Sequence, residues 1–187
     1  MKAFSVAAAL VSALSLMASA SSTVTLRVAR DATVAFNGIL CANDTVPCSS
    51  LRFGLDTKLL TFRGNRDYER VLLGFDLPLN APTKCVLRVP PPLESAQPSG
   101  YALTVSVTDD FWDEQSVSGY TKKIDGSNLG SVNVTTAGGR GSLDITGACK
   151  DAKNHKLSLW VDTQSSMISF NSLQSGSPDV FTLEYTF

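Results

Sequence analysis

Apolar and polar residues alternate with a period of two along most of the chain, and this pattern limits the protein to a β-sheet architecture. In the segment 103–107, leucine and valine alternate with threonine and serine, and segments 157–161 and 181–187 repeat the pattern. Similar short runs occur at 24–28, 32–36, 58–62, 70–75, 84–89, 132–134, 143–145 and 167–170. About ten short strands in one domain predict an all-β fold, a two-sheet antiparallel β-sandwich of the jelly-roll type. A helical period is limited to one short turn at 147–154.

The first twenty residues differ in composition from the rest of the chain. Lys2 precedes an apolar, alanine-rich run at 4–17, and Ala18-Ser19-Ala20 has the small-x-small pattern of a cleavage site. This predicts a secretory signal peptide at 1–20, because the apolar run is short for the alternative, a membrane anchor. Residues 21–187 then form a single β-sandwich domain, which is expected to be a monomer that is secreted and extracellular or associated with a cell wall.

The charge balance limits the classes of partner. The sequence has 16 Lys and Arg residues against 17 Asp and Glu residues, a net charge of −1. Nucleic-acid binding depends on a basic surface, so this near-neutral balance argues against such a partner. A glycan or a protein partner is compatible with it.

The four cysteines predict disulfides. An even number on a secretory route implies two bonds, for which three pairings are possible. We predict Cys41–Cys48, which closes a small loop, and Cys85–Cys149, which joins distant strands. A zinc site is the alternative, but there is no C-x-x-C motif, and His155 is the only histidine.

Two N-x-S/T sequons predict exposed glycosylation sites on a secreted chain. Asn43 begins Asn-Asp-Thr inside the predicted Cys41–Cys48 loop, and Asn133 begins Asn-Val-Thr between strand residues. The alternative for both is an unmodified polar segment.

An acidic cluster surrounds Trp112 in the stretch VTDDFWDEQSVSGY, residues 107–120. In the favoured interpretation, Asp109 and Asp110 accept backbone N–H groups at a turn, and Trp112 packs into the edge of the sandwich. The second interpretation is a calcium site that uses Asp109, Asp110 and Asp113, although the EF-hand spacing is absent. Calcium is the only candidate cofactor.

The third interpretation of the acidic cluster is catalysis by a pair of carboxylates, as in glycoside hydrolysis. The sequence marks no such pair, and it contains no G-x-S-x-G, H-E-x-x-H or P-loop motif. His155 lies in a polar turn, so it is expected to be a solvated loop residue. The sequence therefore favours a protein that is not an enzyme.

The order of several motifs resembles a known family. The segments YERVLLGFDLP (68–78), KCVLRV (84–89), LTVSVTDDFWDEQSVSGY (103–120) and GSLDITGAC (141–149) resemble successive strands of secreted DNRLRE-type domains, which overlap carbohydrate-binding module family 96. Trp112 and Glu114 fall on the W-x-E positions of that pattern. The resemblance implies a jelly-roll β-sandwich of the kind that accompanies polysaccharide enzymes. The cysteines and the proline-rich segment 90–100 are additions to the family pattern.

Candidate ligand-binding residues are aromatic and basic side chains in expected loops. Tyr120 precedes Lys122 and Lys123, Arg140 lies in a GGRG turn, and Phe111 and Tyr68 are further aromatic candidates. The alternative is ordinary solubilisation of loops by charge. We expect a secreted, non-catalytic carbohydrate-binding-like domain that acts at a cell wall or an extracellular polysaccharide. The alternatives are a structural or protein-interaction sandwich without glycan specificity, and a small polysaccharide-active enzyme.

Overall fold

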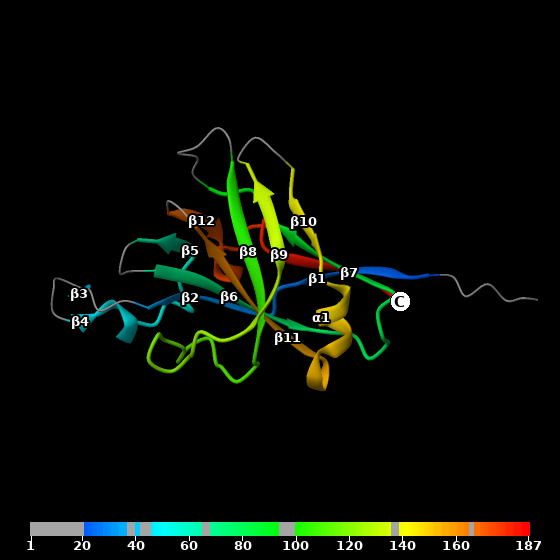
Figure 1. Cartoon of the computed structure of the whole chain (residues 1–187), viewed down its shortest axis with the longest axis horizontal. Coiled ribbons are helices and arrows are strands. Elements are labelled where there is room, and N and C mark those ends of the chain that lie inside the picture. Colours follow the sequence, from blue (N-terminus) through cyan, green and yellow to red (C-terminus); the bar gives the residue numbers. More distant parts are fainter. Residues whose placement is uncertain are drawn as a thin grey trace, which may run out of the picture.

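The computed structural model describes residues 21–36, 40–41, 46–64, 68–93, 100–135, 139–164 and 167–187, with the side chains of Leu40 and Cys41 excluded. Two antiparallel sheets lie face to face in this part of the chain (Figure 1). The predicted signal peptide at 1–20 and the sequon at Asn43 fall outside the described residues, and so does the predicted Cys41–Cys48 bond, because the side chain of Cys41 is excluded.

The smaller sheet has four strands in the order β1-β13-β7-β10. Its strands are β1 (Thr23–Arg27), β13 (Thr182–Thr186), β7 (Lys84–Val89) and β10 (Gly141–Asp144).

The larger sheet has seven strands. Six follow the order β12-β5-β6-β11-β8-β9, and β2 pairs with β6. Its strands are β2 (Arg30–Ala35), β5 (Lys58–Arg63), β6 (Tyr68–Asp76), β8 (Tyr101–Thr108), β9 (Ser127–Val134), β11 (Lys156–Thr163) and β12 (Ile168–Asn171). A separate pair comprises β3 (Leu40–Cys41) and β4 (Val46–Pro47).

The all-β sandwich is confirmed, and each predicted strand run corresponds to a strand of the structure. The predicted helical turn is α1 (Thr146–Asp151), which is followed by the 3-10 turn η2 (Lys153–His155). The turns η1 (Cys48–Ser50) and η3 (Leu173–Ser175) and the short pair β3–β4 were not predicted. None of the helices in the described ranges is long and apolar enough to cross a membrane.

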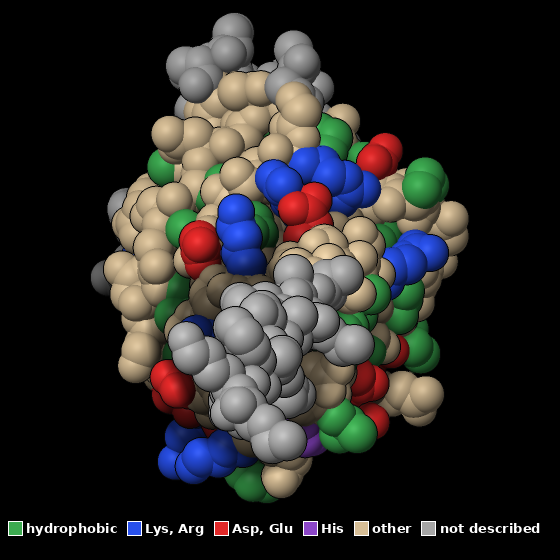
Figure 2. All heavy atoms as spheres, turned by 90° about the vertical axis from the view of Figure 1, so that its right-hand side faces the viewer, with side chains coloured by type: hydrophobic (Ala, Val, Ile, Leu, Met, Phe, Trp, Pro, Cys, Tyr) green, Lys and Arg blue, Asp and Glu red, His purple; other side chains and the backbone are tan. Residues whose placement is uncertain are grey.

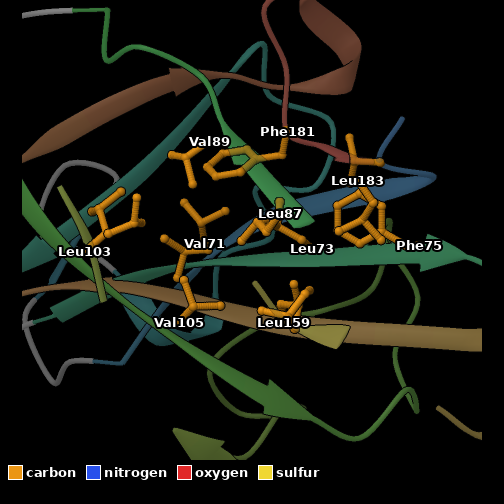
Figure 3. Close-up of a cluster of buried hydrophobic side chains, with 14 of the residues drawn as sticks. Val71, Leu73, Phe75, Leu87, Val89, Leu103, Val105, Leu159, Phe181 and Leu183 are labelled. Atoms are coloured by element: carbon orange, nitrogen blue, oxygen red, sulfur yellow. The ribbon is translucent and has the colours of Figure 1, made fainter. Parts of the chain in front are cut away.

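The main core fills the space between the two sheets. Figure 3 shows side chains of β6, β8 and β11 from one sheet meeting those of β7 and β13 from the other. Leu103 and Val105 are buried there, as the alternation predicts, and Val107 at the end of β8 is partly exposed. Phe170 and Phe181 meet edge to face with ring centroids 5.2 Å apart. Burial of one face of each strand is the main contribution to stability.

The predicted Cys85–Cys149 disulfide is present. It joins β7 to α1 across a sequence separation of 64 residues. The prediction placed both cysteines in strands, but Cys149 lies in the helix α1. Closure of a loop of this length stabilises the fold by roughly 4 kcal/mol in the chain-entropy model. The bond fixes α1 against the end of the sandwich, beside the start of β11.

Candidate functional site

The acidic segment after β8 folds back over the outer face of the larger sheet. Ala32, Leu72 and Trp160 lie opposite one another on β2, β6 and β11, so their side chains share that face. Val34, Phe36, Val117 and Trp112 complete this second apolar cluster. Trp112 is therefore an apolar filler, as expected. It covers the outer face of the sheet and not the edge of the sandwich.

Polar contacts fix the orientation of Trp112. Its indole Nε1 donates to Ser158 Oγ at 2.9 Å, and the guanidinium of Arg30 lies 4.4 Å from the ring centroid. Asp110 accepts from Arg30 and from Ser158 Oγ, the latter at 2.6 Å. Gly74 lies beneath this stack, where a Cβ would be 2.5 Å from Arg30 Nε. The close approach explains why a glycine is needed within β6.

The other carboxylates of the acidic cluster also have structural partners. Asp109 forms an ion pair with Lys122 at 2.8 Å, and Asp113 Oδ1 accepts the N–H groups of residues 115 and 116 at 3.1 Å. Glu114 Oε1 accepts the backbone N–H of Asp31 at 2.7 Å. Each acid therefore anchors the segment to itself or to the sheet, as the structural interpretation predicts.

The structure gives no support to the calcium interpretation of Asp109, Asp110 and Asp113. Within the described part of the chain, no three His, Cys, Asp or Glu side chains form a group that could hold a metal ion. Burial alone would raise the pKa of Asp109, but hydrogen bonds from Lys122 and the Phe111 amide outweigh it, so this pKa is lowered.

Two of the predicted cationic ligands are already engaged. Lys122 is only 3% exposed, and its Nζ contacts both the carboxylate and the backbone carbonyl of Asp109. This burial removes Lys122 as a surface ligand, contrary to the prediction. Arg140 donates to the carbonyl oxygens of Pro178 and Val180 at 3.1 and 2.6 Å, so it anchors a neighbouring loop.

The aromatic candidates occupy different environments. Tyr68 is partly buried, and its ring stacks on that of Phe36 with centroids 5.5 Å apart. The guanidinium carbon of Arg70 lies 5.5 Å from the centroid of the Tyr68 ring. Tyr120 is 68% exposed, and Lys123 beside it is exposed as well. Phe111 is 91% exposed. The structure thus separates Tyr68 from the two loop aromatics that face solvent.

A groove of about 760 Å³ lies at the end of the sandwich, and Phe111 forms part of its rim. The C-terminal end of β8, the start of β9 and the start of β11, which pairs with β8, form one wall from the larger sheet, and α1 and η2 form the other. Apolar side chains contribute to both walls: Val107, Leu129, Ala148, Ala152 and Leu157. The polar residues at the groove are Thr108, Asp109, Asp110, Ser127, Asp151, Lys153, Asn154, Lys156 and Ser158.

Local hydrogen bonds explain why one aromatic residue is exposed and its neighbour is not. Asp109 Oδ1 accepts the N–H of Phe111 at 2.9 Å, and the Asp110 carbonyl accepts the N–H of Trp112 at 3.0 Å. These turns direct Trp112 to the sheet and leave Phe111 at the groove. The sequence marked Phe111 as a candidate, but it did not show the opposite wall.

That opposite wall depends on the turn η2, which follows α1. Asn154 and His155 have positive φ angles of 54° and 56°, and they reverse the chain between α1 and β11. Asparagine tolerates this left-handed conformation better than most residues, so Asn154 was the available signal. His155 is exposed on this turn, as predicted.

Three further features lie outside the groove: the length of the loop after β8, the sequon at Asn133 and the distribution of surface charge. The loop after β8 ends before Ser127, where β9 begins and pairs with Val107. Asn133 is exposed on β9, an edge strand, and its glycosylation stays a prediction. Basic and acidic side chains are intermingled on the face shown in Figure 2, in agreement with the near-neutral composition.

The sequence was compared with family models and with curated proteins. No protein-family model matches the sequence. A curated relative from Arthroderma benhamiae, described as an "uncharacterized secreted protein", is 27% identical over 161 residues. The match covers 83% of this chain and 82% of the relative. The similarity therefore extends over most of both proteins.

Proposed function

We propose that this protein is a secreted, non-catalytic β-sandwich that binds carbohydrate in the groove beside Phe111. The observation that carries the proposal is an almost fully exposed phenyl ring at the rim of a groove with apolar walls and polar edges. The secreted relative and the predicted signal peptide support the extracellular location. The resemblance to DNRLRE-type and family 96 modules supports a role at a cell wall or an extracellular polysaccharide.

The chemistry of the groove suits a sugar. A pyranose ring presents an apolar C–H face that stacks on an aromatic ring, and its hydroxyl groups require both donors and acceptors. Phe111 provides the aromatic surface. The amide of Asn154 and the hydroxyl of Ser127 offer neutral polar groups, and Lys153 and Lys156 add donors.

Non-catalytic binding is favoured by the state of the carboxyl groups. A general acid for glycoside cleavage needs a raised pKa at the site of the sugar. Burial raises the pKa of Asp31, Glu69 and Asp162, but none of these lines the groove. Asp109, which does line it, has a lowered pKa because Lys122 and the Phe111 amide stabilise its charge despite partial burial.

The test is retention of the purified protein on a panel of insoluble and immobilised polysaccharides, including fungal and plant wall fractions. We expect saturable binding to at least one polymer and a loss of about tenfold or more in affinity in Phe111→Ala, because stacking depends on this ring. Leu79→Ala is the matched control, since Leu79 is 82% exposed but does not line the groove.

The outcomes separate the competing functions. Equal retention of Phe111→Ala and the unmodified protein contradicts the proposed groove, and no retention on any polymer contradicts carbohydrate binding. Release of reducing sugar from a retained polymer shows an enzyme instead of a binding module.

A protein-binding sandwich is the second candidate, and one observation favours it. Phe111, Tyr120 and Ile124 are all substantially exposed on the same connection between β8 and β9. Several exposed apolar side chains near one another are typical of a surface that another protein covers. Capture of a defined extracellular protein, lost in Tyr120→Ala but insensitive to competing sugars, would support this alternative.

A further inference from the structure

A second hollow lies on the outer face of the smaller sheet, lined by residues other than those of the groove. It has a volume of about 620 Å³, and β1, β7, β13 and the loops before β10 and β13 contribute to it. Three of its lining residues are arginines: Arg27, Arg88 and Arg140.

Strand register brings two of these arginines together. Arg27 on β1 lies opposite Thr182 on β13, and Thr182 lies opposite Arg88 on β7. Residues directly opposite one another on neighbouring strands project from the same face. The side chains of Arg27 and Arg88 therefore flank Thr182 on the outer surface, and Arg140 enters from the loop before β10.

The loop before β13 holds two of the guanidinium groups in place. Arg27 Nη2 donates to the Ser177 carbonyl at 3.0 Å, and Arg140 donates to the carbonyls of residues 178 and 180. Carbonyl oxygens orient a guanidinium without cancelling its charge. A guanidinium has five N–H donors, so each of these contacts leaves donors for a ligand.

The acids at the hollow cancel only part of its charge. Glu184 pairs with Arg88 at 2.7 Å, and Asp179 pairs with Arg140 at 3.1 Å. Arg27 is instead held by a neutral oxygen in the contact described above. Arg88 Nε is also buried and lacks a hydrogen-bond partner within the described structure. Oriented donors, a residual positive charge and an orphaned N–H are the features of an anion site.

We propose that the hollow between Arg27, Arg88 and Arg140 binds a tetrahedral oxyanion, a sulfate or phosphate group. Guanidinium forks match the oxygen spacing of such groups and bind them through charge-assisted hydrogen bonds. Thr182 lies between Arg27 and Arg88 in the strand register and lines the hollow, so its hydroxyl group would serve as a further donor. This site is independent of the carbohydrate groove, because the two share no lining residue.

The experiment is a titration of the full-length secreted protein with inorganic sulfate and inorganic phosphate at constant ionic strength, followed by amide NMR shifts. Arg27→Gln is the test variant, because the Arg27 guanidinium donates to a neutral carbonyl oxygen, whereas Arg88 and Arg140 each pair with an acid. We expect saturable shifts at Thr182 and Ser177 and about tenfold weaker binding in the variant. Arg52→Gln is the control, since Arg52 is exposed but does not line the hollow.

A second variant guards against misfolding. Arg88→Gln combined with Glu184→Gln removes an ion pair without changing the net charge, and it should weaken binding by a similar factor. The proposal is overturned if the amide shifts of the unmodified protein do not saturate with sulfate or phosphate and resemble those that chloride causes. Equal weakening by Arg27→Gln and Arg52→Gln overturns it too, because only long-range charge would then matter. A sulfated oligosaccharide that binds more tightly than inorganic sulfate identifies a glycan as the source of the anion, and equal binding identifies the free ion.

Discussion

We predict that Asp31→Asn makes the protein more stable at neutral and alkaline pH and removes much of the pH dependence of its stability. Asp31 is 0% exposed on β2. Its Oδ2 accepts the N–H of Leu173 at 2.8 Å, but its Oδ1 is buried and has no partner in the described structure. Gln174 Oε1 is another buried acceptor without a described partner.

The magnitude follows from the pKa. Burial raises the pKa of Asp31 from 3.8 to about 7, opposed by the Leu173 hydrogen bond and assisted by the negative charge of Glu114. One pKa unit corresponds to about 1.4 kcal/mol, so the shift is equivalent to at most about 4 kcal/mol. The folded state holds the proton more tightly than the unfolded state. Its stabilising contribution is therefore complete below pH 3.8, falls as pH rises toward 7 and is absent above that pH.

The assay is urea unfolding with intact disulfides at intervals from pH 4 to pH 8. The free energy of unfolding of the unmodified protein should fall across this range, and Glu69 and Asp162 add to the fall because burial raises their pKa values also. The difference between Asp31→Asn and the unmodified protein should change by about 3–4 kcal/mol in favour of the variant as pH rises. Asp76→Asn, on the exposed end of β6, is the control. Parallel stability curves for Asp31→Asn and the unmodified protein would refute this reasoning.

Two further substitutions test the packing of the sandwich. Gly74→Ala should lower the free energy of unfolding by roughly 1–3 kcal/mol, because the new Cβ meets Arg30 at 2.5 Å and Trp112 at 3.0 Å. A red shift of tryptophan emission should accompany the change. An unchanged urea midpoint would contradict this prediction. Replacement of Cys85 and Cys149 together by alanine should cost roughly 2–4 kcal/mol, measured by urea unfolding against a sample with all disulfides intact. A loss below about 0.5 kcal/mol would show that this loop closure contributes little.

The sandwich could be predicted because one buried face per strand leaves a period-two record in the sequence. Leu103 and Val105 show it clearly, and both are buried between the sheets. The cover on the outer face left a weaker signal. Leu72 lies between two core residues of β6, so the run Val-Leu-Leu at 71–73 is apolar on both faces. Such an uninterrupted run indicates a strand that is covered on both sides.

The candidate site was less predictable because it depends on contacts between distant segments. Phe111 could be selected as an aromatic residue in a polar loop, but the wall that faces it comes from α1 and η2, about forty residues later in the sequence. Burial of Lys122 was unpredictable for the same reason. A lysine in a polar loop reads as a solvated cation, and only the folded turn shows that Asp109 holds it.

The acidic cluster around Trp112 is best understood as the set of anchors that positions Phe111. Asp110 attaches the segment to Arg30 on β2, and Glu114 attaches it to the backbone of Asp31 one residue further along the same strand. Trp112 lies between these attachments and packs on the sheet. With both sides of the turn fixed, the backbone of Phe111 is held at the groove, and under the proposed function this lowers the entropic cost of binding. The four carboxylates that suggested catalysis or calcium therefore act as structural anchors, and under the proposed function they contribute to binding by keeping Phe111 in place.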